Sequence, residues 1–291
     1  MNIIQSVFLG IVQGVTEFLP VSSSGHLAIL QNIFHIDTGS TMLFDILLHL
    51  GTLAAIFIVY HKDIGKMIVE FFKMIGDLFF NLRIFFLNKI HGTSLKYRRV
   101  VHNNYRKFVV LILVSTIPTA LIGLVGKQLV AAASNTLLIP GICLLMTGIL
   151  LLIADNSPEG RKLPKEITCK NGLLIGIAQG LSTLPGLSRS GTTITACLLC
   201  GMDRRFAVKY SFILSIPAVL GAAVLEIKDA AAESVTAGTL GVYLVGMVVA
   251  AVVGYICIKA LLIVVRGKKF KYFSWYCFAA GVLAIAGHFL I

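Results

Sequence analysis

A carboxylate, three serines and a histidine stand close together near the start of an otherwise apolar chain. The segment QGVTEFLPVSSSGHL covers residues 13–27. Its reactive side chains are those of Glu17, Ser22, Ser23, Ser24 and His26. A carboxylate can act as a general base or a metal ligand, a serine hydroxyl as a nucleophile, and an imidazole as an acid for the leaving group. These residue types predict hydrolytic chemistry.

A second segment repeats this pattern 166 residues further along the chain. GIVQGVTEFLPVSSSGH (10–26) aligns without gaps with GIAQGLSTLPGLSRSGT (176–192). The identical positions pair Gly10, Ile11, Gln13, Gly14, Ser22, Ser24 and Gly25 with Gly176, Ile177, Gln179, Gly180, Ser188, Ser190 and Gly191. At the same offset only apolar character continues, in 44–53 and 210–219. Internal similarity of this kind predicts two related halves.

The shared residues of the two segments suit a phosphate group. Each segment ends in SSSG or SRSG, at the point where a second half-helix would begin. Hydroxyls, glycine N–H groups and the positive end of a helix dipole bind anions, and the guanidinium of Arg189 can donate two hydrogen bonds to phosphate oxygens. We predict that the two loops face each other and bind two adjacent phosphates. The phosphate-binding residues would be Gln13, Ser24, Gly25, Ser188, Ser190, Gly191 and Thr192.

The first segment differs from the second at two positions of catalytic type. Glu17 and His26 correspond to Thr183 and Thr192 at the offset of 166 residues. We therefore expect catalysis to depend on the first copy. Two simpler interpretations stay open: the serines cap helix N-termini, and Glu17 and Arg189 form an ion pair that locks the two segments together.

The composition identifies the surroundings of these polar segments as a membrane. Of the 291 residues, 57% are hydrophobic and 13% are charged, whereas soluble domains carry about 25% charged residues. We predict an all-α polytopic membrane protein. Six stretches are long enough to span a bilayer, namely 42–60, 108–126, 136–154, 206–226, 238–265 and 272–291. Three further histidines, His35, His49 and His288, are interpreted as hydrogen-bonded core residues.

The polar segments lie in two regions that are too short and too polar to span. Residues 1–36 and 172–201 each contain two apolar pieces around a centre rich in Gly, Pro and Ser. Such pairs suit re-entrant helical hairpins. Three spans separate the hairpins, and an odd number inverts the second copy, so the two tips would meet near the midplane of the membrane. The expected units are a first inverted repeat over 1–160 and a second over 170–291.

Loop charge predicts the orientation, because cytoplasmic loops carry an excess of Lys and Arg. The connection 61–107 carries ten Lys and Arg against three acids. The loops at 155–170, 203–209 and 266–271 are also basic, whereas 127–135 and 227–237 are not. Both termini and the first hairpin would then face outside. The net charge of +12 is explained by these loops and requires no nucleic-acid partner.

The basic connection also contains a segment with mixed aromatic and cationic residues, GKMIVEFFKMIGDLFFNLRIFFLNK (65–89). Two interpretations are open. The segment lies along the inner membrane interface as an amphipathic helix, or it extends the neighbouring spans.

The two motifs QGVTEFLPVSSSGH and PGLSRSGTT closely resemble those of the bacterial undecaprenyl-diphosphate phosphatase family, also called the bacitracin-resistance protein family. The similarity in length and span pattern covers essentially the whole chain. The resemblance implies an enzyme of the bacterial cell membrane. Such an enzyme would remove the terminal phosphate of undecaprenyl diphosphate, so that the monophosphate carrier returns to cell-wall synthesis, and it would confer bacitracin resistance.

By the same resemblance, Glu17 is the essential glutamate of the family, Ser22 and Ser23 are its motif serines, and His26 is its histidine. In the second motif, Ser188, Arg189 and Ser190 match, with Arg189 as the phosphate-binding arginine. The family implies a divalent cation, Mg²⁺ or Ca²⁺, for which Glu17 is the candidate ligand. The chain departs from some members at Gln13, where they have a second glutamate.

From these residues we expect a diphosphate head group to enter between the hairpins from the outer face. Ser23 is the first candidate for the nucleophile and Ser22 the second. An equal chemical alternative is a water activated by Glu17 or His26, with no covalent intermediate. The alternative function is a transporter or flippase for polyprenyl phosphate lipids, because inverted repeats with broken helices also build transporters. The expected partners are the polyprenyl diphosphate and bilayer lipids, with a homodimer left open.

Overall fold

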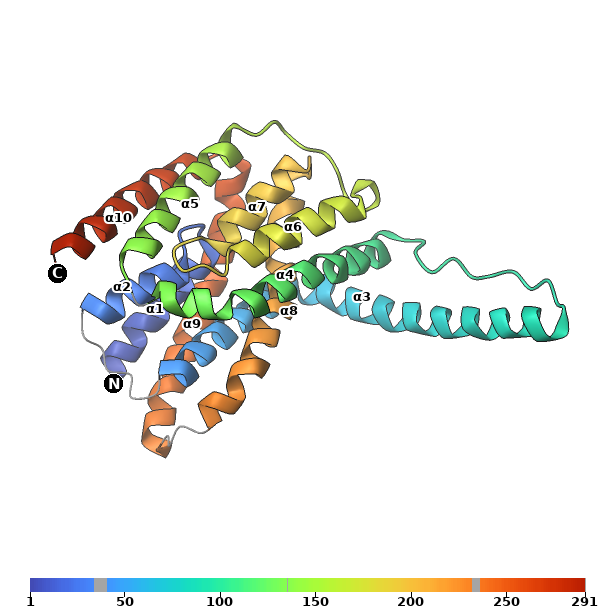
Figure 1. Cartoon of the computed structure of the whole chain (residues 1–291), viewed down its shortest axis with the longest axis horizontal. Helices are drawn as coiled ribbons and strands as arrows, with labels where there is room; N and C mark the ends of the chain where they lie inside the picture. Colours follow the sequence, from blue (N-terminus) through green and yellow to red (C-terminus); the bar gives the residue numbers. More distant parts are fainter. Residues whose placement is uncertain (34–40, 135, 232–235, 291) are drawn as a thin grey trace.

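The computed structural model describes residues 1–33, 41–134, 136–231 and 236–290. The regular secondary structure of these residues is helical, apart from a single bridge between Lys162 and Met202, which confirms the all-α prediction (Figure 1). The helices are α1 (Ile3–Phe18), α2 (Ser23–Ile33), α3 (Thr41–His91), α4 (Asn104–Ser134), α5 (Leu138–Asn156), α6 (Cys169–Leu181), α7 (Arg189–Leu199), α8 (Arg204–Ala231), α9 (Ala237–Arg266) and α10 (Phe270–Leu290), with a 3₁₀ turn at Pro164–Glu166. His35 and residues 34–36 of the predicted first hairpin lie outside the described residues.

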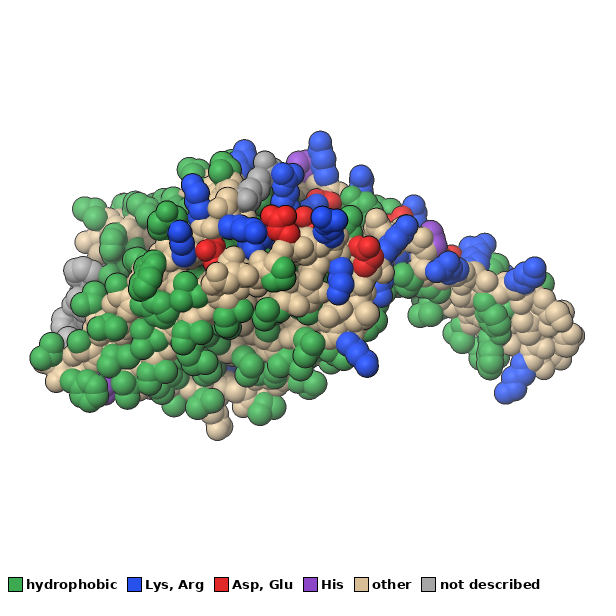
Figure 2. Space-filling model, turned by 90° about the horizontal axis from the view of Figure 1, so that it is seen from above, with side chains coloured by type: hydrophobic (Ala, Val, Ile, Leu, Met, Phe, Trp, Pro, Cys, Tyr) green, Lys and Arg blue, Asp and Glu red, His purple; other side chains and the backbone are tan. Residues whose placement is uncertain are grey.

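Six of these helices, α3, α4, α5, α8, α9 and α10, are long and apolar enough to cross a membrane. They coincide with the six predicted spans. Apolar side chains cover most of the face shown in Figure 2, and Lys and Arg gather along one of its edges. This distribution is that of a multi-pass membrane protein.

The first span is much longer than predicted. α3 has 51 residues, and its only non-helical residue is Tyr60, with φ −106° and ψ 19°. The sequence from Tyr60 to His91 contains no proline, and its Leu, Met and Lys residues favour a helix, so no residue stops the helix. We call residues 61–103, which comprise this extension and the segment that returns to α4, the arm. Its helix is continuous with the span, and the arm projects away from the bundle (Figure 1).

Four short helices make up the two polar regions. α1 and α2 have 16 and 11 residues, and α6 and α7 have 13 and 11. A turn joins the two helices of each pair, and the serines that the two segments share lie at this turn. At the first turn Ser22 adopts φ 72°, a left-handed conformation that is costly for a residue with a Cβ atom.

Glycines bring α1 and α6 into backbone contact with their neighbours. A Cβ atom on Gly10 would lie 2.6 Å from the carbonyl oxygen of Gly246 in α9, and one on Gly176 would overlap the carbonyl oxygen of Ser115 in α4. Only glycine permits such approach, which is typical of helix packing in membranes. α1 is thereby fixed on α9, and α6 on α4.

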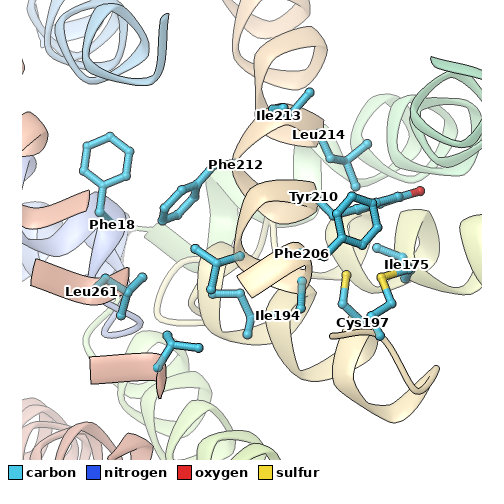
Figure 3. Close-up of a cluster of buried hydrophobic side chains, with 14 of the residues drawn as sticks. Phe18, Ile175, Ile194, Cys197, Phe206, Tyr210, Phe212, Ile213, Leu214 and Leu261 are labelled. Carbon is cyan, nitrogen blue, oxygen red and sulfur yellow. The ribbon is translucent and has the colours of Figure 1, made fainter. Parts of the chain in front are cut away.

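The buried core lies directly behind the polar turns. Phe18 packs edge-to-face on Phe212 of α8, with ring centroids 5.3 Å apart, and Figure 3 shows both rings within the cluster that also contains Tyr210. The hydroxyl of Tyr210 bonds to Ser115 Oγ, at 2.7 Å, and donates to the carbonyl oxygen of Leu111. Because Phe18 follows Glu17 directly, this packing also positions the Glu17 side chain.

Candidate functional site

The turns of the two helix pairs touch each other. A Cβ atom on Gly25 would lie 2.9 Å from Cα of Gly186, and one on Gly191 would lie 3.3 Å from Cβ of Pro20. Gly186 has φ +90°, a conformation that favours glycine. The two polar segments, more than 150 residues apart in the sequence, therefore meet at one place.

Side chains on two further helices donate hydrogen bonds to carbonyl groups of these turns. Thr147 Oγ1 on α5 donates a hydrogen bond to the carbonyl oxygen of Gly186, at 3.1 Å, and accepts one from the N–H of Ser188, at 3.0 Å. Cys277 Sγ on α10 donates to the carbonyl oxygen of Pro20, at 3.8 Å. The turns are therefore anchored within the bundle.

One serine in each turn caps the following helix. Ser22 Oγ accepts a hydrogen bond from the N–H of Gly25, at 3.3 Å, and Ser188 Oγ accepts one from the N–H of Gly191, at 3.1 Å. The N-cap interpretation of these serines is confirmed. Both hydroxyls are buried, so they are less available for chemistry than their neighbours.

Glu17 is the centre of the site. Its side chain is 3% exposed and forms an ion pair with Arg189 through Oε1. Ser23 Oγ donates a 2.6 Å hydrogen bond to Oε2, and Gln13 Nε2 donates a second one, at 3.1 Å. The structure thus confirms the ion pair between the two segments, and it also places a serine hydroxyl directly on the carboxylate. A buried carboxylate beside a hydroxyl is the arrangement that activates a nucleophile.

His49 is a site residue that the sequence analysis missed. Its Nδ1 lies 3.0 Å from Gln13 Nε2 and 3.7 Å from Glu17 Oε2. The signal that could have found it is the comparison of the two halves. At the offset of 166 residues, His49 corresponds to Ser215, so it is another titratable residue that only the first copy contains.

His26 is directed to a different neighbour. Its Nδ1 donates a 2.7 Å hydrogen bond to the carbonyl oxygen of Ser22, and its Nε2 lies 2.6 Å from the hydroxyl of Tyr276, whose ring it stacks on. Because a carbonyl oxygen only accepts, Nδ1 bears the proton and Nε2 accepts from Tyr276. The structure does not bring the His26 ring to the Ser23–Glu17 pair. The ring instead holds the turn in which Ser22 has positive φ.

The other predicted phosphate-binding residues divide into two groups. Ser24 is exposed and lines a cavity together with Glu17 and Arg189. Ser190 and Thr192 are buried in the first turn of α7, and the hydroxyl of Thr192 has no hydrogen-bond partner among the described residues. Ser190 Oγ lies 3.3 Å from Ser188 Oγ. Ser190, Gly191 and Thr192 therefore lie behind the cavity wall.

The cavity has a volume of about 530 Å³ and joins polar and apolar walls. Its polar end contains Glu17, Ser23, His49 and Arg189, and Arg189 lies at the N-terminus of α7. Its apolar wall is formed by Met42, Ile46, Val130, Leu187, Ala218, Val219, Ala222 and Ala223. Two further acids, Asp45 and Glu226, also line the cavity. A cavity that places the Arg189 guanidinium beside an apolar wall suits an amphiphile with an anionic head group.

The residues do not form a resident metal site. The described part of the chain has no cluster of three His, Cys, Asp or Glu side chains that could hold a metal ion. Both oxygens of Glu17 already accept hydrogen bonds, one of them from the Arg189 guanidinium. Mg²⁺ and Ca²⁺ require several oxygen ligands, so we derive no step through a protein-bound cation.

Comparison with known proteins assigns the chain to a family. Residues 6–283 match the family described as bacitracin resistance protein BacA. The undecaprenyl-diphosphatase of Alkaliphilus metalliredigens is 40% identical over 285 residues, which cover 98% of each chain. The protein of the same name from Desulforapulum autotrophicum is 39% identical over the full length of both chains, and that of Methanosphaera stadtmanae is 38% identical over 98% of each. The chain therefore belongs to the bacitracin resistance protein BacA family.

Proposed function

We propose that the protein is an integral membrane phosphatase that hydrolyses undecaprenyl diphosphate to undecaprenyl phosphate and inorganic phosphate. This activity recycles the lipid carrier of cell-wall synthesis and confers bacitracin resistance. The observation that supports it most directly is the hydrogen bond from Ser23 to Glu17 beside Arg189, at the polar end of an apolar-walled cavity. The names of the relatives agree with this proposal.

In the proposed reaction, Ser23 Oγ attacks the terminal phosphorus while Glu17 accepts the hydroxyl proton. The bond between the terminal phosphorus and the bridging oxygen breaks, and undecaprenyl phosphate leaves with that oxygen. Water then attacks the phosphorus of the phosphoserine. The bond from phosphorus to Ser23 Oγ breaks, Ser23 takes back the proton held by Glu17, and the oxygen and both protons of the water leave as dihydrogen phosphate. Ser22 is less suited to attack, because its hydroxyl already accepts the N–H of Gly25. The direct attack of a water activated by Glu17 gives the same products without the phosphoserine.

We propose that Arg189 binds Glu17 before the substrate enters and the diphosphate afterwards. Without substrate its guanidinium bonds to Glu17. A diphosphate in the cavity would compete for the guanidinium, because planar bidentate contact with phosphate oxygens is favourable. Glu17 would then lose a neutralising contact and become a stronger base for Ser23. Arg189 and the N-terminus of α7 would stabilise the charge that develops on the transferred phosphate.

The other residues are assigned to positioning and binding. We place Ser24 at the phosphates, in the cavity lining. Gly25, Ser188, Ser190, Gly191 and Thr192, which the sequence also predicts as phosphate-binding residues, are assigned to shaping the two turns from behind the cavity wall. Gln13 holds Glu17 from the side opposite Arg189. For His26 the bond to the Ser22 carbonyl supports a positioning role in the turn that presents Ser23.

We also propose that the two halves form an inverted repeat with two re-entrant hairpins. Equivalent contacts support it: Gly14 meets Val253 and Gly180 meets Ile122, with Cβ approaches of 2.8 and 2.7 Å. Thr147 and Cys277 likewise bond to carbonyl groups at matching positions, those of Gly186 and Pro20. The matched contacts run from α1 to α9, from α6 to α4, and from each turn to α5 or α10.

The proposed orientation has both termini outside and the arm in the cytoplasm, with the site open to the outer face. It can be tested by single cysteines placed at Ala131 and Lys96, in a background in which the six native cysteines are replaced. We expect an impermeant thiol reagent to label position 131 and not position 96 in intact cells. Labelling of position 96 from outside would overturn this orientation.

The test of function uses purified protein in detergent, without a sealed membrane, and undecaprenyl diphosphate. We expect stoichiometric release of phosphate by the wild-type chain. Binding of the lipid without phosphate release would instead support the alternative, a transporter or flippase for polyprenyl phosphate lipids. The matched control variant is Thr183→Ala, which changes the repeat counterpart of Glu17 in the same cavity and should retain activity.

A further inference from the structure

The arm, residues 61–103, has no counterpart in the second half of the chain. Between α1 and α6 equivalent residues are 166 positions apart, as in Gly10 and Gly176, which make matching contacts. Between α4 and α9 the offset is 131, as in Ile122 and Val253. The first half therefore contains 35 more residues before α4, and these form most of the arm. The arm projects away from the bundle (Figure 1), and none of its residues lines the cavity, so the phosphatase site does not explain it.

One face of the arm helix is apolar and exposed. The side chains on this face follow one another at intervals of three, four or seven residues, which is the repeat of a single helical face. They are Ile68, Phe72, Phe79, Leu82, Phe86 and Ile90, each between 49% and 69% exposed. We call them the apolar stripe. In Figure 2 most of the apolar side chains of the arm lie along one edge and most of its Lys and Arg along the other.

The opposite face of the helix is polar and is covered by the returning segment. Asn81 Nδ2 donates to the carbonyl oxygen of Arg98, at 2.8 Å, and Asn88 Nδ2 donates to that of Leu95, at 3.0 Å. Reciprocal bonds run from the N–H groups of Arg98 and Leu95 to the same two side chains. The returning segment therefore pairs with the arm helix as a hairpin, and the apolar stripe stays exposed within the part of the chain that the structure describes.

The charges of the arm leave an excess of cations. Its three acids are all in ion pairs: Glu70 and Asp77 with Arg106, at 2.6 Å each, and Asp63 with Lys209, at 2.8 Å. The arm itself carries Lys62, Lys66, Lys73, Arg83, Lys89, Lys96, Arg98 and Arg99. Cations beside an exposed apolar face are complementary to an anionic lipid surface.

We propose that the arm binds the surface of the membrane that α3 spans, with the apolar stripe at the boundary between head groups and acyl chains, and that it selects anionic phospholipids. The continuity of the helix supports this partner, because α3 passes from the span into the arm with only the kink at Tyr60. The arm therefore begins at the membrane surface and is held there by the span. Its function is that of a lipid-sensitive anchor at the membrane surface, separate from the cavity.

A tryptophan reporter tests the proposal on the full chain in vesicles. The chain has one tryptophan, Trp275, so Trp275→Phe provides the background. Phe79→Trp reports on the stripe, and Lys96→Trp, in the returning segment, is the matched control. In phosphatidylcholine vesicles that contain brominated lipid and phosphatidylglycerol, we expect Phe79→Trp emission to fall about two-fold relative to unbrominated vesicles. Emission from Lys96→Trp should be quenched by aqueous iodide instead.

Three results would overturn the proposal. The first is equal quenching of both reporters by iodide with no effect of brominated lipid, which would mean that the stripe faces water. The second is quenching by brominated lipid that does not depend on phosphatidylglycerol. The third is a Phe79→Trp signal that changes with the protein-to-lipid ratio but not with lipid type, which would identify a second copy of the chain as the partner. Unchanged phosphate release by both reporter variants in detergent verifies that each is folded.

Discussion

Ser23 Oγ donates a 2.6 Å hydrogen bond to Oε2 of Glu17, although the two residues belong to different helices. Glu17 lies in the last turn of α1 and Ser23 begins α2. The intervening turn, in which Ser22 has positive φ, reverses the chain and directs the hydroxyl back to the carboxylate. This relationship distinguishes the three neighbouring serines and leads to the first prediction.

Replacement of Ser23 should affect chemistry, and replacement of Ser22 should affect stability. We expect Ser23→Ala to lower kcat for phosphate release by at least about 10³-fold, because it removes the hydroxyl that Glu17 activates. Ser22→Ala should keep most of the activity and lower the free energy of unfolding by about 1 kcal/mol, because it removes an N-cap. The measurements are phosphate release and thermal unfolding in detergent. Full turnover by Ser23→Ala would exclude it as the nucleophile.

The Glu17–Arg189 pair leads to a second prediction. Glu17→Gln removes the base but keeps the shape of the side chain, so we expect kcat to fall about 10²–10⁴-fold while the protein remains folded in detergent. Arg189→Lys keeps the charge but loses the planar bidentate contact, and it should be nearly as inactive as Arg189→Ala. Wild-type turnover in Glu17→Gln or Arg189→Ala would contradict the assignment of the site.

His49 should act as a positioning residue through Gln13 and Glu17. We expect His49→Ala to lower kcat about ten-fold while KM changes less than about two-fold, because the contacts of Glu17 weaken but the phosphate-binding groups remain. His49→Gln, which can still bond to the Gln13 amide, should recover part of kcat. His288→Ala is the control. The interpretation of His288 as a core residue is wrong, because its side chain is exposed in the last turn of α10. An equal loss in both alanine variants would show that the effect is not specific to the site.

Close helix packing predicts a contrast between two glycines. A Cβ atom on Gly176 would overlap the carbonyl oxygen of Ser115, whereas one on Gly65 in the arm meets no atom within 4 Å. We expect Gly176→Ala to destabilise the protein by about 1–3 kcal/mol through overpacking. Gly65→Ala should be neutral or stabilising by up to about 1 kcal/mol, because alanine favours the helix. Thermal unfolding of the two variants in one detergent measures the difference. Equal melting temperatures would argue against the tight contact of α6 with α4.

The family's expected divalent cation leads to a last prediction. The described residues lack a three-ligand cluster, so we propose that Mg²⁺ or Ca²⁺ enters bound to the diphosphate and not as a resident ion. Removal of divalent cations by EDTA should then lower phosphate release without lowering the melting temperature of the substrate-free protein. A fall in melting temperature on chelation, reversed by Mg²⁺, would instead indicate a resident site.

The sequence alone determined the class of fold and the position of its spans. Span length and hydrophobicity are local properties, because a bilayer requires about 20 apolar residues in a helix wherever the chain continues afterwards. The six predicted spans correspond to α3, α4, α5, α8, α9 and α10 for this reason. The internal repeat also identified the two polar segments, since residues kept in both copies stand out within apolar sequence.

Only the tertiary structure decided how those polar residues pair. Ser22 and Ser23 are alike in the sequence, and the turn geometry alone makes one an N-cap and the other a partner of Glu17. His49 joins the site because α3 packs against α1, whereas His26 is turned toward Tyr276 of α10. Side-chain direction at a helix end depends on which helices pack around it, and that information lies in contacts between residues far apart in the chain.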